Sequence, residues 1–194
     1  MVRHISLNWL RLPALAALLL VVGCASNPKH AQTPQFRTED DLYDWHPEGL
    51  TGKTTVTIDL QRQVAEVFIG GERAGWCYVA TGKEGYDTEA GEFKILEKIA
   101  DKKSDTYGWI VDADGQTIVQ DAKVGRDKPP KGGEFVHAPM PYWMRISWHG
   151  IGMHAGIIPQ PGQPASHGCI RMPHPFAPLL FDVVKVGTPV TVIK

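Results

Sequence analysis

The chain has 194 residues, with 20 lysines and arginines against 21 aspartates and glutamates and a formal net charge of −1. This balance argues against nucleic acid as a partner, because nucleic-acid-binding proteins cluster basic charge to replace phosphate counterions. A chain of this length holds enough residues for one well-buried domain and little more.

The first residues carry the pattern of an export signal. Arg3 and Arg11 flank a polar start, and the run LPALAALLLVVGC is apolar but shorter than the ~20 residues that a membrane span needs. The run ends in Val21-Val22-Gly23-Cys24, which resembles a bacterial lipobox, where lipid is attached to the cysteine and the chain is cut just before it. An ordinary secretory signal and an uncleaved anchor are the alternatives. We expect residues 1–23 to be a lipoprotein signal peptide.

Lipidation of Cys24 would anchor the mature protein in the cell envelope, on the periplasmic side. Ala25 does not signal retention in an inner membrane, so the outer membrane is favoured. Several acyl chains together hold a protein on a membrane stably, where one chain would not. Removal of the signal takes Arg3 and Arg11 but no acid, which leaves a mildly acidic mature chain.

Residues 24–50 have the composition of a tether, rich in proline, threonine, glutamine and acids. The first half has too little apolar surface to offset the entropy of ordering it. In the second half, Leu42, Tyr43 and Trp45 leave open a second possibility, that they pack onto the domain as an edge segment. We expect the folded domain itself to span residues 51–194.

Short strands dominate the domain. Val56, Ile58 and Leu60 alternate with polar residues, which is the pattern of a half-buried strand. Further strands are predicted over residues 64–69 and 74–81 around Gly70-Gly71, over 91–98, over 109–120 folded about Asp114-Gly115, over 148–155, and over 188–193.

The clearest helix signal lies near the C-terminus, in HPFAPLLFDVVK. There Phe176, Leu179, Leu180 and Val183 recur at helical spacing after Pro175. Together with the many short strands, this predicts a mainly β fold, a sandwich or partly closed barrel with one or two short helices.

Residues 121–143 contain many lysines, prolines and glycines, which predicts a long loop. Loops of this length are usually functional lids or disordered segments. We expect this one to form a lid or substrate wall, with Tyr142 and Trp143 lining a groove. The alternative is that its apolar end only packs the loop onto the core.

The stretch PASHGCIRMP concentrates residue types that carry chemistry. A cysteine attacks as its thiolate, so Cys169 needs a base or a cation nearby. His154, at a strand end in GIGMHAG, can lie across from a thiol placed in a strand-to-helix turn, and would be the general base. The amides of Gly168 and Cys169 could hold the oxyanion of a tetrahedral intermediate. Arg171 is suited to binding a substrate carboxylate through a bidentate fork.

These residues resemble the catalytic signature of the YkuD-type L,D-transpeptidases, peptidoglycan-modifying cysteine enzymes. The signature is a histidine, a spacer and then Ser/Thr-His-Gly-Cys, matched here by GMHAG and PASHGCIRMP, and the resemblance extends over about residues 54–193. It implies that Cys169 is the nucleophile and His154 the base, and that His167 lies near the oxyanion. It also implies that the Ala155 carbonyl orients the ring of His154. We expect Ser166, Tyr142 and Trp143 to contact substrate with Arg171.

The activity that the resemblance implies is acyl transfer on peptidoglycan stem peptides. Cys169 would attack the bond between an L-centre and the following D-residue, release D-Ala and form a thioester, which an amine acceptor then opens. With water as the acceptor, the same residues would give an L,D-carboxypeptidase. We expect no cofactor and no metal, and the sequence leaves the protein partners open.

Two other classes of protein are less favoured. His149, His154, His167 and Cys169 are zinc-ligand types, but the close spacing of His167 and Cys169 is unusual for zinc. A cell-wall-binding lipoprotein without activity would not need an intact Cys169 and His154. Cys77 is expected to be a buried strand thiol, with a regulatory disulfide to Cys169 as the alternative in an oxidising periplasm.

Overall fold

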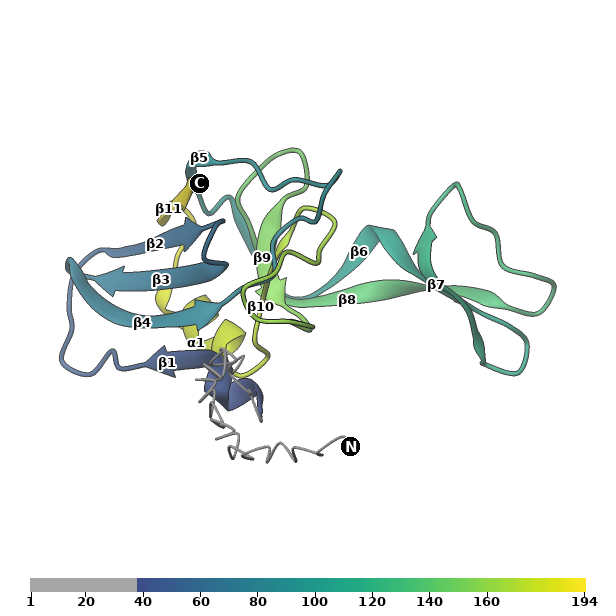
Figure 1. Cartoon of the computed structure of the whole chain (residues 1–194), viewed down its shortest axis with the longest axis horizontal. Coiled ribbons are helices and arrows are strands. Elements are labelled where there is room, and N and C mark those ends of the chain that lie inside the picture. The colour runs from purple at the N-terminus through teal and green to yellow at the C-terminus, as the bar shows by residue number, and fades with distance from the viewer. Residues whose placement is uncertain (1–37) are drawn as a thin grey trace, which may run out of the picture. The chain divides into compact units, whose positions relative to one another are not determined.

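The computed structural model describes residues 38–194 (Figure 1). The predicted signal peptide, Cys24 and the first part of the tether therefore lie outside the described residues. Within the described part, no helix is long and apolar enough to cross a membrane.

Two β-sheets form a sandwich, as the sequence predicts. One sheet has six strands in the order β1-β4-β3-β2-β11-β5, and the other has five in the order β10-β9-β8-β6-β7. The first sheet is built from β1 (Tyr43–Trp45), β2 (Thr54–Asp59), β3 (Val64–Ile69), β4 (Glu72–Tyr78), β5 (Gly91–Lys94) and β11 (Pro189–Ile193). The second is built from β6 (Glu97–Val111), β7 (Thr117–Lys123), β8 (Glu134–Arg145), β9 (Gly152–Ala155) and β10 (Ile170–Met172).

The core lies where side chains of both sheets meet the helix α1 (Phe176–Val183). Val56 and Ile58 of β2 are buried, which confirms the alternation read from the sequence. On α1 the buried residues are Phe176, Ala177 and Leu180, and the helix packs against β8 and β9. Burial of this apolar stripe holds the helix in place, since a helix this short is marginal in isolation.

The predicted strand over residues 91–98 is wrong in one respect, because it is two strands in different sheets. The Ile95 amide donates to the Thr188 carbonyl, next to β11 of the first sheet. The following amide, of Leu96, donates to the Arg145 carbonyl on β8 of the second sheet. The chain therefore crosses between the two layers at these residues, which a period-two pattern does not reveal.

The prediction of a long loop over residues 121–143 is also wrong. β7 continues to Lys123 and β8 begins at Glu134, so only residues 124–133 connect them. Pro139 and Pro141 lie within β8, where β6 pairs along one edge. On the other edge β9 pairs only with Met144 and Arg145, so the missing proline amides remove no bond to that strand.

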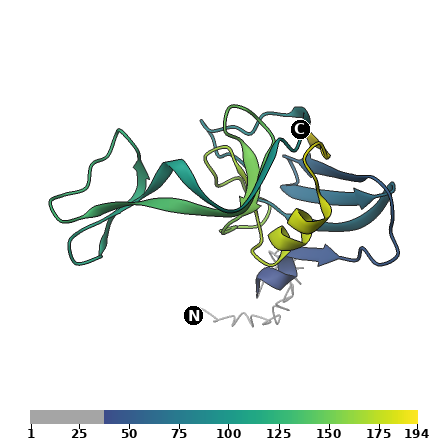
Figure 2. The same ribbon diagram turned by 180° about the vertical axis from the view of Figure 1, so that it is seen from behind.

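The outer parts of β6 and β8, together with β7, form an extension that we call the arm (residues 103–139). Figures 1 and 2 show these strands leaving the two packed sheets and twisting as a narrow ribbon. The turn predicted at Asp114-Gly115 joins β6 to β7, and the Asp112 carboxylate accepts from the amides of Asp114 and Gln116 there.

The second half of the predicted tether is part of the fold. A 3-10 helix, η1 (Glu39–Leu42), leads into β1, which pairs antiparallel with β4 as an edge strand. Leu42 is buried, and the rings of Tyr43 and Trp45 lie 5.7 and 5.6 Å from that of Phe176. Of the two possibilities read from the sequence, packing at the edge is the one observed.

Candidate active site

Two adjacent strands bring the predicted base and nucleophile together. β9 and β10 are parallel, with His154 opposite Arg171, and Cys169 directly precedes β10. Because the two strands are parallel, the spacer carries the chain from the end of β9 back to the start of β10. His154 and Cys169 both line a cavity of about 800 Å³.

The environment of His154 fixes a neutral ring with a defined tautomer. The side chain is 6% exposed, and Nδ1 lies 2.8 Å from the carbonyl oxygen of Ala155. Because a carbonyl only accepts, Nδ1 carries the hydrogen and Nε2 is left as the basic nitrogen. Burial lowers the pKa of His154 to about 4, although the Ala155 bond opposes this shift. The ring is therefore an uncharged proton acceptor at neutral pH.

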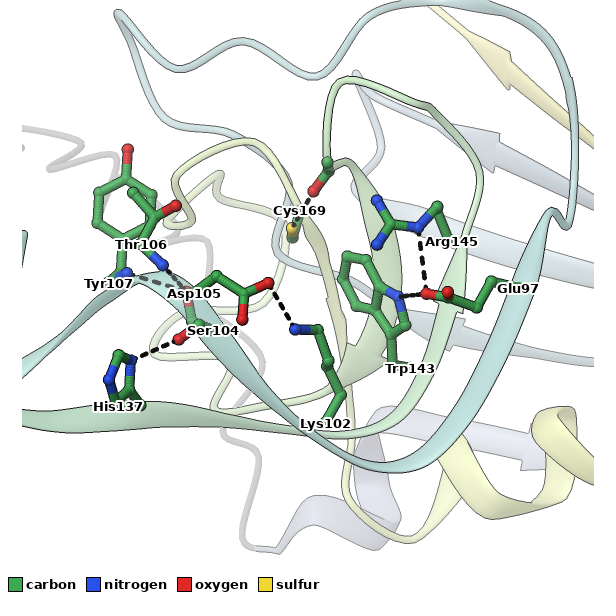
Figure 3. Close-up of polar contacts among 11 residues, drawn as sticks. Glu97, Lys102, Ser104, Asp105, Thr106, Tyr107, His137, Trp143, Arg145 and Cys169 are labelled. Atoms are coloured by element: carbon green, nitrogen blue, oxygen red, sulfur yellow. Dashed lines mark hydrogen bonds and ion pairs between the residues drawn. The ribbon is translucent and has the colours of Figure 1, made fainter. Parts of the chain in front are cut away.

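Cys169 is a protonated thiol at rest. Burial raises its pKa, while a backbone hydrogen bond from Gly152 and the charges of Arg171 and Arg145 act to lower it. The Sγ atom lies 3.7 Å from the carbonyl oxygen of Gly150, to which the thiol donates (Figure 3). A resting thiolate, the form expected of a reactive cysteine, is thus not favoured here, and the thiol must lose its proton when it attacks.

The loop before Cys169 is held by side-chain hydroxyls. Ser166 Oγ accepts from the Gly168 amide at 3.0 Å and donates to the Cys169 carbonyl. The Thr88 hydroxyl donates to the Gly168 carbonyl at 2.8 Å and accepts from the Gly82 amide. Gly168 has φ +110°, a left-handed conformation that side chains rarely adopt.

The two amides predicted to hold an oxyanion differ in their availability. The Gly168 amide is already bound by Ser166. The Cys169 amide makes no hydrogen bond to any other of the residues 38–194. Ser166 is 1% exposed, so its role here is to shape the loop.

His167 points to the arm. Its Nε2 lies 3.2 Å from Asp121 Oδ2 on β7, and its ring stacks on Tyr107 of β6 at 4.4 Å. Tyr86 packs edge-on against the other side, at 4.6 Å. Burial lowers the pKa of His167, and Asp121 opposes the shift. Through these contacts His167 joins the arm to the loop that carries the thiol. His167 also lines the cavity.

The predicted substrate-binding residues are placed differently from one another. Arg171 and Trp143 line the cavity, and the ring of Trp143 lies 6.1 Å from that of His154. Tyr142 has φ +57° and turns its ring to Phe181 of α1, at 5.6 Å. Tyr142 is not among the residues that line the cavity.

Several residues of the site were not identified from the sequence. Arg145 and Asp121 come from strands far away in the chain, and no local motif marks them. Thr88 lies in TEAGEF, where no local feature marks it, because its bond to Gly168 joins residues 80 positions apart. Cys77 is fully buried on β4, and both it and Cys169 are free thiols. In the described part of the chain, no group of three or more histidine, cysteine or acidic side chains could hold a metal ion.

Residues 53–192 match the YkuD family, the L,D-transpeptidase catalytic domain. The match covers most of the chain, which therefore belongs to this family. A comparison with curated proteins found no match.

Solved structures of L,D-transpeptidases share the fold. One from Mycobacterium smegmatis is 22% identical, with a TM-score of 0.55 over 73% of this chain and 59% of that chain. An Enterococcus faecium L,D-transpeptidase with a cysteine-to-serine substitution is 27% identical, with a TM-score of 0.54 over 74% of this chain and 50% of that one. The isolated E. faecium catalytic domain is 28% identical, with a TM-score of 0.52 over 75% of this chain and 100% of that one. The chain thus spans only about half to three fifths of the longer enzymes.

Proposed function

We propose that this protein is an L,D-transpeptidase that acts on peptidoglycan stem peptides, with Cys169 as the nucleophile and His154 as the base. The observation that carries the proposal is the cavity shared by the thiol and an imidazole whose Nδ1 is bound to Ala155. Membership of the YkuD family supports the same chemistry.

In the first step, Cys169 Sγ attacks the donor carbonyl carbon as His154 Nε2 takes the thiol proton. Both groups are uncharged at rest, so proton transfer accompanies the attack. The Cys169 amide is free to donate to the oxyanion of the tetrahedral intermediate. The C–N bond then breaks, D-Ala leaves with the proton from His154, and a thioester on Cys169 remains.

In the second step, an acceptor amine attacks the thioester carbonyl and gives a proton to His154. The C–S bond breaks, the new amide is released, and the proton returns to the thiol. Water in place of the amine would yield a carboxypeptidase with the same residues. Membership of the YkuD family, described as the L,D-transpeptidase catalytic domain, favours the amine.

The test is intact-mass spectrometry and product analysis after incubation with purified disaccharide-tetrapeptide. We expect an acyl adduct on Cys169 and a cross-linked dimer. The Cys169→Ala variant should give neither, whereas the matched Cys77→Ala variant should keep both. A tripeptide product alone would establish the carboxypeptidase, and unchanged substrate with the intact enzyme would overturn the proposal.

A second readout does not depend on the choice of peptide. One of the matched L,D-transpeptidases was solved in complex with imipenem. We propose that imipenem acylates Cys169 of this protein, which a mass increase in the intact chain but not in Cys169→Ala would reveal.

We further propose that Cys24 is lipidated and that the protein is held in the cell envelope, on the periplasmic side of the outer membrane. The apolar run before Cys24 and the small residues around it support this. Labelling of cells with a fatty-acid analogue should mark the full chain but not Cys24→Ser, and fractionation should place the labelled chain with outer membranes. Unlabelled protein would contradict the anchor without affecting the proposed chemistry.

A further inference from the structure

The cavity has two guanidinium groups on opposite sides of the base. β9, which carries His154, lies between β10 and β8 in the sheet. Arg171 stands on β10 and Arg145 at the end of β8, and both line the cavity with Cys169. A substrate bound over β9 would therefore meet a guanidinium on each side of His154.

Arg145 is held in a fixed orientation by Glu97. Its Nε donates to Glu97 Oε1 at 3.1 Å, and the Trp143 indole nitrogen donates to the same oxygen at 3.2 Å. The guanidinium carbon lies 5.6 Å from the Trp143 ring. Figure 3 shows this group with its terminal nitrogens turned toward Cys169. These terminal nitrogens make no hydrogen bond within residues 38–194.

Arg171 has no carboxylate partner in the described part of the chain. Its aliphatic stem packs on Gly156, where a Cβ would lie 3.1 Å from Cγ. Its guanidinium is left for the cavity, partly out of water. A partly buried guanidinium without a partner calls for an anion, and its planar fork matches a carboxylate.

Of the two guanidiniums, only Arg145 has a carboxylate partner in the described part of the chain, Glu97. Asp105 is the only acidic residue in the lining, and it is paired with Lys102 at 2.7 Å. His154 is uncharged at neutral pH. With Lys102 paired to Asp105 and Arg145 paired to Glu97, the lining keeps one positive charge without a carboxylate partner, that of Arg171, and a second guanidinium whose terminal nitrogens make no hydrogen bond within residues 38–194.

We propose that Arg145 is a specificity-determining residue that, with Arg171, selects donor peptides bearing two free carboxylates near the bond that is cut. This inference rests on the proposed function and names its substrate class. One carboxylate is that of the terminal D-residue, and the other belongs to a diamino acid with its own free carboxyl group. Stem peptides in which that group is a carboxamide, or in which the diamino acid is lysine, are disfavoured.

The test measures binding in a Cys169→Ala background, so that no turnover is needed. Three tetrapeptides are compared, with a diaminodicarboxylate, its side-chain carboxamide or lysine at the third position. We expect the carboxylate form to bind about ten- to a hundredfold more tightly, the range of a charge-assisted bond to a partly buried group. With Arg145→Gln added, the three affinities should converge. The control Arg73→Gln, which removes an exposed arginine bound to Glu66, should keep the preference.

Equal binding of the three peptides to the protein with Arg145 intact would overturn the inference, as would an equal loss for all three with Arg145→Gln. If Arg145→Gln does not fold, Arg145→Lys keeps the charge but lacks the fork and should reduce the preference. Product analysis with Cys169 intact is separate: failure to turn over any peptide would count against the proposed function, while the binding preference still decides the role of Arg145.

Discussion

At the residue scale, the pKa values of the proposed base, His154, and the proposed nucleophile, Cys169, move apart. Burial lowers the pKa of His154 and raises that of Cys169, so both shifts disfavour charge. With both groups uncharged, the thiol has to give up its proton when it attacks a carbonyl. The thiol is thereby kept from reacting as a free thiolate, since the thiolate is the form that oxidises readily.

The depressed pKa of His154 predicts a pH-dependent stability. Between pH 6.5 and about 4, the unfolded chain binds a proton at this residue and the folded chain does not. Stability should therefore fall as the pH falls through this window, by on the order of 3 kcal/mol. Urea unfolding at a series of pH values measures the slope.

The variant His154→Gln should lose much of this slope, and His46→Gln, at an exposed histidine, should retain it. A lowered pKa of His167 contributes in the same direction, so a smaller slope should remain. An identical slope in the His154→Gln variant would show that the ring titrates near its ordinary pKa in the folded protein.

Thr88→Val should weaken the loop that carries the thiol. The change keeps the side-chain shape but removes a hydroxyl bound to the Gly168 carbonyl and to the Gly82 amide. Because both groups would be left unpaired, we expect a loss of about 1–3 kcal/mol in unfolding free energy and slower acylation by imipenem. Thr88→Ser keeps the hydroxyl and should behave like the wild type. Equal acylation rates for the three proteins would contradict this role.

At the element scale, His167 ties the arm to the loop that carries Cys169. His167 follows Ser166 in the motif, yet its ring lies between Tyr107 and Tyr86 and is paired with Asp121 on β7. The sequence predicted a wall for the substrate from residues 121–143, and residues of β6 and β8 do line the cavity. These residues line the cavity as parts of paired strands and not as a loop. A strand can contain prolines where its edge is unpaired, because the missing amides then remove no hydrogen bond from the sheet.

Asp121→Asn should slow acylation more than it destabilises the fold. The pair is partly exposed, so its loss should cost less than about 1 kcal/mol. Without the carboxylate, the pKa of His167 should fall further, since Asp121 now opposes the effect of burial. NMR titration of the ring and imipenem acylation rates measure the two effects. The control is Asp114→Asn, at the exposed turn of the same arm.

At the scale of the whole molecule, the folded unit begins before the region that matches the family. η1 and β1 precede residue 53 but pack on α1 and β4. The second half of the tether predicted up to residue 50 therefore belongs to the folded unit, because Leu42, Tyr43 and Trp45 have apolar partners there.

A chain that begins at residue 51 should be less stable than one that begins at residue 38. The truncation uncovers Phe176 and removes buried Leu42, and each large apolar side chain that loses its burial costs roughly 1.5–3 kcal/mol. Thermal unfolding of the two chains measures the difference. Leu42→Ala in the longer chain should give part of the loss, and equal midpoints would show that this segment contributes nothing.

The sequence by itself determined those features that local patterns encode, which are the positions of single strands, of the helix and of the motif. Alternation gave β3 its observed bounds, 64–69, and helical spacing located α1, because burial of one face imposes these periods. The motif predicts Cys169 as the nucleophile and His154 as the base, since nucleophilic chemistry calls for few residue types.

Only the tertiary structure decided which distant residues meet. The break at Ile95, the strand that contains Pro139 and Pro141, and the positions of Arg145 and Asp121 depend on which strands become neighbours. Which strands become neighbours is decided by the packing of the two whole sheets, and each single residue contributes only a small part of that packing energy. For the same reason the pKa values of His154 and Cys169 could not be read from their neighbours in the chain: burial, the main cause of both shifts, comes from the complete fold.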